Sequence, residues 1–327
     1  MRTSFATVAV AALAVGATLV GTGQVAAGQA NQERRPGSPE VAPYMELTGV
    51  NRDNLEAAVD TGLGAVTAAF VVGKGCTPTW DDGTAVAKNK QVARAIGTAQ
   101  QRGVQVMVSF GGAGGVELAR GCHNLGRLVA AYQSVVDRFS VTSVDFDIEG
   151  DAINPVEEKA SIHRRFAAIR ALQQDNPAIV VSATIGVGLS GLPHDQLAFL
   201  RVAKQTGTTI DLVNLMTMDY GGPVDDMGAA ATNATQRGLA QLQRLWPSYT
   251  YPNVGITPMI GRNDSAQETT SLADAAAIAG FGADNGVGRL AFWSLNRDQQ
   301  CPGSKARGDC SGVPQQPLDF TRAFLGG

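Results

Sequence analysis

The sequence contains three acidic residues that alternate with apolar ones, in the stretch Val144-Asp145-Phe146-Asp147-Ile148-Glu149-Gly150. Side chains of an extended strand point alternately to opposite faces, so the three carboxylates share one face and the apolar side chains share the other. Three acids on one side of a buried strand repel one another, which disfavours their charged forms. A strand shaped for stability alone would avoid this arrangement. We therefore interpret the stretch as the functional centre of the chain.

The composition is that of a globular protein with an ordinary surface. The chain has 327 residues, of which 44% are hydrophobic and 17% charged, with a formal net charge of -3. This length suffices for one large domain with a sizeable core. No basic run and no interleaving of aromatic and basic residues occurs, so nucleic acid is not expected as a partner. The mildly acidic surface suits an uncharged or small soluble substrate.

The N-terminus has the features of a secretory signal peptide. Arg2 provides the positive charge, residues 6–20 form an apolar run, and small residues around Ala26, Ala27 and Ala30 offer a cleavage site. The run is short for a membrane span and no second one follows, so no membrane partner is expected. The sequence predicts a signal peptide over residues 1–30, a flexible linker over 31–40 and a secreted, extracellular protein.

Four cysteines fit an exported protein. Cys301 and Cys310 lie close together in a loop rich in Pro and Gly, which favours a short disulfide between them. Cys76 and Cys122 then remain for a second disulfide. Four cysteines allow three connectivities, so this pairing is a preference, and four free buried thiols are the alternative.

Eight strand–helix alternations follow the linker, and most strands are continuous apolar runs, as expected for parallel strands covered on both faces. The predicted strands cover residues 41–47, 65–72, 104–110, 141–149, 178–185, 211–218, 251–259 and 289–294. The predicted helices cover residues 53–60, 84–101, 124–139, 155–175, 193–206, 232–245, 272–279 and 318–324. We predict a single α/β domain, a (β/α)8 TIM barrel, over residues 41–327.

A doubly wound open sheet is the alternative fold. It is disfavoured because no Gly-x-Gly-x-x-Gly follows the first strand. Residues 111–115 are rich in glycine but lack the Lys-Ser/Thr of a phosphate-binding loop. In a barrel the active site lies at the carboxyl ends of the strands. Candidate residues fall at four such ends, in the stretches 109–112, 147–149, 216–220 and 292–294.

The three acids have other readings besides catalysis. Asp145, Asp147 and Glu149 imitate the start of an EF-hand calcium loop, but position twelve is Val156 and a strand precedes the acids instead of a helix. A divalent metal site would consist of carboxylates alone, because no histidine lies at a strand end. A carboxylate network that merely ties loops together is the third alternative. We expect no metal and no cofactor.

Four motifs together resemble glycoside hydrolase family 18, the chitinases and their relatives. Residues 142–149 match the family's Asp-x-x-Asp-x-Asp-x-Glu motif except at the first position, which is Thr142. Residues 109–112 match its Ser-x-Gly-Gly motif. Residues 216–220 resemble its strand-six motif, and Trp293 matches the tryptophan of its eighth strand. The resemblance extends from about residue 41 to 325 and implies the barrel fold predicted above.

The residues and the resemblance together suggest roles in cleaving a glycosidic bond. Glu149 is expected to be the acid that protonates the leaving oxygen. The negative charge of the neighbouring Asp147 favours keeping a proton on Glu149 or shared between the two side chains. No second carboxylate nucleophile is apparent. The resemblance implies that the 2-acetamido group of the substrate attacks instead, giving an oxazolinium intermediate and retention. It also implies that Asp147 binds the acetamido N–H and that Asp145 holds Asp147.

The remaining candidate site residues are expected to contact the substrate or shape the site. Strand six can be aligned with the family motif in two ways, which place either Met218 or Tyr220 where relatives carry a tyrosine. We favour Tyr220 as the hydroxyl that orients the acetamido carbonyl. Asp219 is a second candidate for sugar contact, and Trp293 is expected beneath the sugar ring. The other candidates that shape the site are Met216, Met218, Ser109, Gly111 and Gly112.

The sequence therefore predicts a secreted glycoside hydrolase of the chitinase type, acting on β-1,4-linked N-acetylglucosamine polymers or oligomers. We expect the protein to act as a monomer. An endo-β-N-acetylglucosaminidase acting on glycoprotein glycans is an alternative with the same chemistry. A non-catalytic chitin-binding lectin of the same fold is another, although such proteins usually lose one of the acids that are present here.

Overall fold

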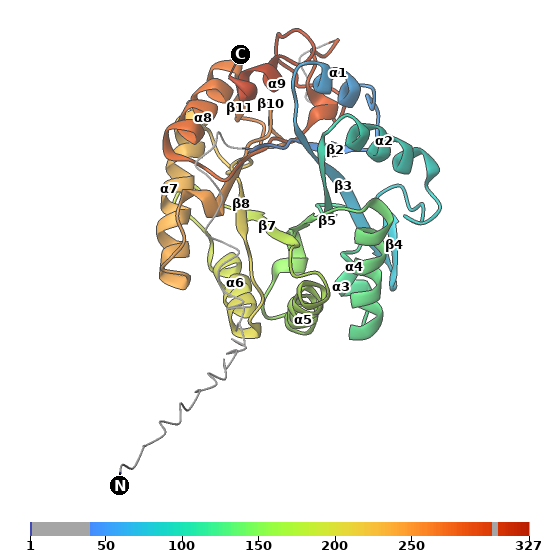
Figure 1. The fold of residues 1–327 in the computed structure, drawn as a ribbon. Helices are drawn as coiled ribbons and strands as arrows, with labels where there is room; N and C mark the ends of the chain where they lie inside the picture. Colours follow the sequence, from blue (N-terminus) through green and yellow to red (C-terminus); the bar gives the residue numbers. More distant parts are fainter. Residues whose placement is uncertain (2–39, 303–306, 327) are drawn as a thin grey trace. The chain divides into compact units, whose positions relative to one another are not determined.

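The structure, a computed structural model, describes residues 1, 40–302 and 307–326 (Figure 1). Contacts divide the chain into residues 1–33 and 34–327, and every described residue other than Met1 belongs to the second unit. The signal peptide predicted over 1–30 and the linker predicted over 31–40, apart from Met1 and Glu40, lie outside the described residues and remain predictions. In the described part of the chain, no helix is long and apolar enough to cross a membrane.

The predicted (β/α)8 barrel is confirmed: parallel strands curl into a closed sheet, with helices around it (Figure 1). The described strands are β1 (Glu40–Val41), β2 (Tyr44–Glu46), β3 (Ala65–Lys74), β4 (Thr77–Trp80), β5 (Gln105–Gly111), β6 (Ser143–Asp147), β7 (Val180–Gly186), β8 (Leu212–Met216), β9 (Val254–Thr257), β10 (Gly261–Arg262), β11 (Thr269–Thr270) and β12 (Arg289–Leu290). The strand order is β1-β12-β9-β8-β7-β6-β5-β3-β2. β1 pairs with β12 and β2 pairs with β3, so residues 40–46 close the barrel.

The helices follow the strands along the chain, as the alternation predicts. They are α1 (Asn54–Asp60), α2 (Lys90–Gln101), α3 (Leu118–Gly121), α4 (Leu125–Phe139), α5 (Lys159–Asp175), α6 (His194–Thr206), α7 (Met227–Leu245), α8 (Leu272–Asn285) and α9 (Asp319–Leu325). Short 3-10 helices are η1 (Gly150–Ile153), η2 (Tyr251–Asn253) and η3 (Leu295–Arg297).

One predicted helix begins later than expected, and a strand that was not predicted, β4, precedes it. β4 pairs antiparallel with the end of β3, and α2 begins at Lys90 instead of residue 84. Asn89 caps the helix by accepting a hydrogen bond from the Val92 amide at 3.0 Å. Trp80 is fully buried and packs against Phe139 with ring centroids 5.9 Å apart. This tertiary contact favours the strand.

Three other helix ends differ from the prediction, because a local turn, a side-chain cap and a left-handed glycine set them. α5 begins at Lys159 instead of Pro155, since the Asn154 side chain accepts hydrogen bonds from the next amides and forms a turn there. α7 begins five residues earlier than predicted, capped by Asp226. α8 continues through Gly280, the predicted stop, and ends at the left-handed Gly286.

The strands divide the core into an apolar layer and a polar barrel interior. Along β6, Val144 and Phe146 lie in the large hydrophobic cluster, while Asp145 and Asp147 point to the other face. Phe146 stacks on Phe110 of β5 with centroids 5.2 Å apart. The barrel interior therefore holds buried polar groups in a surrounding of low polarity, where unpaired charge is costly.

Candidate active site

A cavity of about 190 Å³ opens at the carboxyl ends of the barrel strands. It is lined by Tyr44, Phe70, Ala113, Asp147, Glu149, Met216, Met218, Asp219, Thr257, Met259, Asp264 and Trp293. These residues come from segments far apart in the sequence and meet where active sites of such barrels lie. Six of the predicted site residues, from three strand ends, are among them: Asp147, Glu149, Met216, Met218, Asp219 and Trp293.

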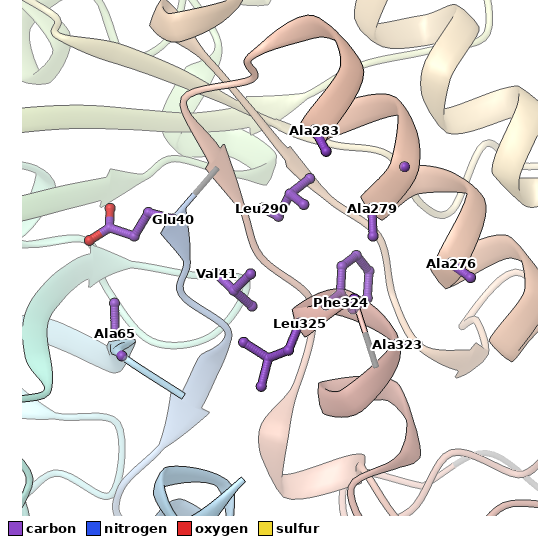
Figure 2. Close-up of a pocket in the computed structure, with 13 residues that line it drawn as sticks. Glu40, Val41, Ala65, Ala276, Ala279, Ala283, Leu290, Ala323, Phe324 and Leu325 are labelled. Carbon is purple, nitrogen blue, oxygen red and sulfur yellow. The ribbon is translucent and has the colours of Figure 1, made fainter. Parts of the chain in front are cut away.

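A larger groove of about 740 Å³ lies elsewhere, between β1, α8 and α9 (Figure 2). Its lining is small and apolar, with Ala276, Ala279 and Ala283 along α8, and Glu40 as its one ionisable side chain. A single carboxylate offers no acid–base pair. The smaller cavity, with its group of carboxylates, is therefore the candidate active site.

Asp145 lies beneath the cavity, fully buried, in a cage of hydroxyl groups. Its Oδ2 accepts hydrogen bonds from Ser109 at 2.7 Å and Tyr44 at 2.9 Å. Its Oδ1 accepts hydrogen bonds from Ser182 at 2.5 Å and Thr184 at 2.8 Å. The four contacts fix the carboxylate and account for its burial. Ser109 therefore acts through Asp145 and does not line the cavity.

Asp147 and Glu149 form a coupled pair on one wall of the cavity. Asp147 is buried, and its Oδ1 has no hydrogen-bond partner among the described residues. Burial, with the neighbouring charges of Glu149 and Asp145, raises the pKa of Asp147 well above its usual value. Burial also raises the pKa of Glu149, as does the charge of Asp219. The two carboxyl groups therefore retain a proton between them more strongly than isolated acids do.

Glu149 keeps the alternation of β6 although the strand ends at Asp147. Its backbone is extended, with φ -128° and ψ 167°, and η1 begins directly after it. Two extended residues return the side chain to the same face. Glu149 is half-buried at the cavity, one step closer to solvent than Asp147. The three acids therefore lie in order from the buried interior to the mouth of the cavity.

Two glycines at the end of β5 allow the close approach of neighbouring groups. Gly111 has φ 112°, and a Cβ atom there would collide with the Asp147 carbonyl oxygen. Gly112 has φ 84°, and a Cβ would lie 2.6 Å from the Phe70 ring. Neither conformation nor space admits a side chain. Gly111 and Gly112 thus shape the surroundings of Asp147 without lining the cavity.

The end of β8 differs from the sequence prediction at Tyr220. Tyr220 is absent from the cavity lining and packs against the large hydrophobic cluster, and its buried hydroxyl has no partner among the described residues. The reason is Asp219, whose left-handed φ of 50° turns the chain, so that strand alternation stops there. β8 thus presents Met216, Met218 and Asp219 to the cavity.

Aromatic rings form the opposite wall. Trp293 stacks on Phe70 with centroids 5.5 Å apart and planes at 17°, and Tyr44 lies 6.3 Å from the Trp293 ring. Sequence reasoning missed Tyr44 and Phe70. Both lie within predicted strands, where an aromatic residue is ordinarily interpreted as part of the core, so no local signal pointed to them.

Comparison with known proteins gives a consistent picture. No family model matches the chain. It is 32% identical over 278 residues to a protein named "probable bifunctional chitinase/lysozyme" of Escherichia coli (strain K12), covering 79% of this chain and 30% of that protein. It is 31% identical over 275 residues to endochitinase 11 of Metarhizium anisopliae, covering 79% of this chain and 52% of the relative. The chain thus spans between about a third and a half of these relatives.

Solved structures agree with the curated relatives. The catalytic domain of a hyperthermophilic chitinase from Pyrococcus furiosus has a TM-score of 0.78 and 26% identity, with 88% of this chain and 94% of that one covered. Both curated relatives and this solved structure are named as chitinases. The resemblance drawn from the four motifs is confirmed.

The one departure from the family 18 acid motif lies away from the cavity. Thr142 is exposed, just before β6, and its carbonyl accepts a hydrogen bond from the Val180 amide at 2.9 Å. A side chain at this position does not reach the cavity lining. The departure at Thr142 therefore leaves the three acids in place.

The preferred cysteine pairing is confirmed. Disulfides join Cys76 to Cys122 and Cys301 to Cys310. The first connects the β3–β4 hairpin to the end of α3, and the second closes a short loop after η3. Four free thiols, the alternative, are excluded.

Proposed function

We propose that this protein is a chitinase, hydrolysing the β-1,4 linkages of N-acetylglucosamine polymers or oligomers. The observation that carries the proposal is the pair Asp147 and Glu149 at the cavity, with the pKa of both carboxyl groups raised by burial. Cleavage of a glycosidic bond needs an acid that is still protonated near neutral pH. The names of both curated relatives support the same substrate class.

Glu149 is the proposed general acid. It lies nearest the mouth, where a glycosidic oxygen can reach it, and the negative charge of Asp219 favours its protonated form. After the leaving group departs, the ionised Glu149 takes a proton from water as that water attacks. The same side chain thus acts first as acid and then as base.

The nucleophile in this proposal is the substrate's own acetamido oxygen. It attacks the anomeric carbon as the glycosidic bond breaks, giving an oxazolinium ion, and water then opens the ring with net retention. The unpartnered Oδ1 of Asp147 is a suitable acceptor for the acetamido N–H. Asp145, fixed by four hydroxyls, holds its neighbour on the same face. A 2-acetamido group at the cleaved position is therefore required.

The aromatic wall is proposed to receive the sugar ring. One face of Trp293 is covered by Phe70, which leaves the ring's cavity side for the apolar face of a pyranose. Asp219 and Met218 are the proposed contacts from β8. Because Tyr220 lies outside the cavity, we assign the acetamido contact on this side to Asp219 and not to Tyr220.

Secretion is part of the proposal and rests on the sequence of residues 1–30 and on the two disulfides. Disulfides persist mainly in oxidising compartments. Detection of the protein in culture medium, with its N-terminus beginning near Gly28 to Asn31, tests this part.

Product analysis tests the activity. The mature protein is incubated with N-acetylglucosamine hexamer and, separately, with the fully deacetylated hexamer, and products are identified by mass spectrometry. Cleavage of the acetylated chain alone is expected. Equal cleavage of both would refute acetamido assistance. Cleavage only of a glycoprotein glycan core would identify the endo-β-N-acetylglucosaminidase, and binding without cleavage would identify the lectin.

Glu149→Gln tests the assignment of the acid. Gln has the same shape but no proton to donate, so hydrolysis should fall by about 10²–10⁴-fold while hexamer binding persists. Calorimetric titration with the hexamer serves as the control for a folded site. Turnover at the wild-type rate would exclude Glu149 as the general acid.

A further inference from the structure

The turn after β8, residues 219–221, is held by a segment distant in sequence. β10 and β11 form a small antiparallel hairpin, and the residues between them contact this turn. The Ser265 amide donates a hydrogen bond to the Asp219 carboxylate at 2.7 Å. Asn263 Oδ1 accepts a hydrogen bond from the Asp219 amide at 3.4 Å. The position of the cavity carboxylate therefore depends on this hairpin.

Glu268 makes two further contacts with the turn. Its side chain is 1% exposed, and its two oxygens accept hydrogen bonds from the Tyr220 amide at 3.0 Å and the Gly221 amide at 2.9 Å. A charged acceptor that bonds backbone amides in a buried place contributes more than a neutral one. Both orphan amides of the turn are thus satisfied by one carboxylate.

The turn needs such support because its backbone is unfavourable. Asp219 has φ 50°, a conformation that L-residues adopt rarely and that persists when surrounding contacts determine it. This same conformation directs Asp219 to the cavity and Tyr220 away from it. The contacts of Glu268 therefore decide which β8 side chain reaches the substrate.

Asp219 acts electrostatically on the acid. The charged side chains facing it come from three regions: Glu149 after β6, Asp264 and Glu268 of the hairpin segment, and Arg297 of η3. Asp147 also faces Glu149. Since Asp219 helps keep the proton on Glu149, a shift of the turn changes both a substrate contact and the charge beside the acid.

We propose that Glu268 is a positioning residue for catalysis, which holds the 219–221 turn so that Asp219 stands beside Glu149. The role rests on the proposed glycosidase activity and deepens it. Glu268 contacts no substrate in this proposal. It acts through Asp219, and its removal should displace the Asp219 carboxylate.

The first test compares Glu268→Gln with Asp298→Asn. Gln turns one acceptor into a donor that faces a backbone N–H, so the turn should be released. Asp298 is a matched control, because this fully buried carboxylate also accepts two backbone amides, those of Phe320 and Thr321, and does not line the cavity. With N-acetylglucosamine hexamer, kcat for Glu268→Gln should fall about 10- to 100-fold. Asp298→Asn should retain wild-type kcat in its folded fraction.

The second test asks whether the effect passes through Asp219. The alkaline limb of kcat against pH should move to lower pH in Glu268→Gln, because the pKa of Glu149 falls when Asp219 moves away. In an Asp219→Asn background, adding Glu268→Gln should change neither kcat nor the pH profile by more than about twofold. An equal loss in both backgrounds would overturn the proposal.

Hydrogen exchange provides a readout that needs no activity. The amides of Tyr220 and Gly221 should lose protection in Glu268→Gln and keep it in Asp298→Asn. Retained protection would overturn the proposal whether or not the protein is a glycosidase. If Glu268→Gln does not fold, Ser265→Pro removes the N–H that holds the Asp219 carboxylate, and the same kinetic shift is expected. Wild-type protein without hydrolysis would instead refute the proposed function.

Discussion

Asp147 shows what a single residue contributes to both function and stability. Its carboxyl group is buried, and Oδ1 lacks a partner among the described residues. A buried polar atom without a partner costs free energy. The sequence already indicates the residue through its spacing from Asp145 and Glu149. The unpartnered oxygen could not be foreseen, because it depends on the distances between strands.

Asp147→Asn should raise the melting temperature near pH 7 while reducing hydrolysis. Burial raises the folded-state pKa of Asp147, so its contribution to stability is present at low pH and is lost as the pH rises through that folded pKa. Asn does not titrate, so the Asp147→Asn variant does not lose stability in this way as the pH rises. The stability gain over wild type should therefore grow from about pH 4 to pH 8. A gain of about 1 kcal/mol in the free energy of unfolding corresponds to a rise of about 2–4 °C in the melting temperature.

Thermal unfolding across this pH range checks the prediction. The exposed Asp284 of α8, changed to Asn, is the control and should show no gain that grows with pH. A wild-type protein that is more stable than Asp147→Asn at pH 7 would contradict the stated cost of burial.

At the scale of elements, the ends of β6 and β8, on either side of β7, show when an alternating pattern predicts side-chain positions correctly. Beyond β6 the backbone stays extended, so Glu149 falls where alternation predicts. Beyond β8 the left-handed Asp219 interrupts the alternation, and Tyr220 packs against the hydrophobic cluster instead of lining the cavity. The hydrogen bonds that favour this turn come from residues 263–268, which no local pattern connects to it.

A buried ion pair joins α3 to α5. Arg165 and Glu117 lie 2.7 Å apart, with side chains 0% and 4% exposed. Burial raises the pKa of Glu117, but the charge and hydrogen bonds of Arg165 outweigh burial, and the pKa is lowered. Two further guanidinium nitrogens of Arg165 have no partner among the described residues. The pair is therefore sensitive to the loss of either member.

Glu117→Gln should lower the free energy of unfolding by about 3–5 kcal/mol, because it leaves the Arg165 charge buried and unpaired. Denaturant titration measures the change. Glu158→Gln is the matched control, since its pair with Arg120 is partly exposed and should contribute under about 1 kcal/mol. Equal losses in the two variants would contradict the argument from burial.

At the scale of the whole barrel, the two disulfides close loops of different length. Cys76 and Cys122 are separated by 46 residues, and Cys301 and Cys310 by nine. Restricting the unfolded chain predicts a larger stabilisation for the longer loop. The two pairs thus provide an internal comparison within one fold.

Replacing Cys76 and Cys122 by Ser should lower the free energy of unfolding by about 4 kcal/mol, against about 2.6 kcal/mol for Cys301 and Cys310, on the chain-entropy model. Guanidinium unfolding of the two double variants under identical conditions measures both. A larger loss for the shorter loop would show that native-state contacts outweigh the unfolded-state term.

The sequence by itself determined the barrel and the order of strands and helices along the chain. It also determined the resemblance to glycoside hydrolase family 18 and the shared face of the three acids. Each follows from short-range periodicity or from motif spacing, which the chain carries locally. It also indicated Trp293, because that residue belongs to a motif at a strand end.

Only the tertiary structure decided which side chains share the cavity. Tyr44 enters it because residues 40–46 close the barrel beside β12, and Tyr220 leaves it because a distant carboxylate, Glu268, holds the turn. Helix starts and the β3–β4 hairpin were likewise settled by caps and by burial of Trp80. The physical reason is common to all: hydrogen bonds and contacts between residues far apart in sequence outweigh local preference.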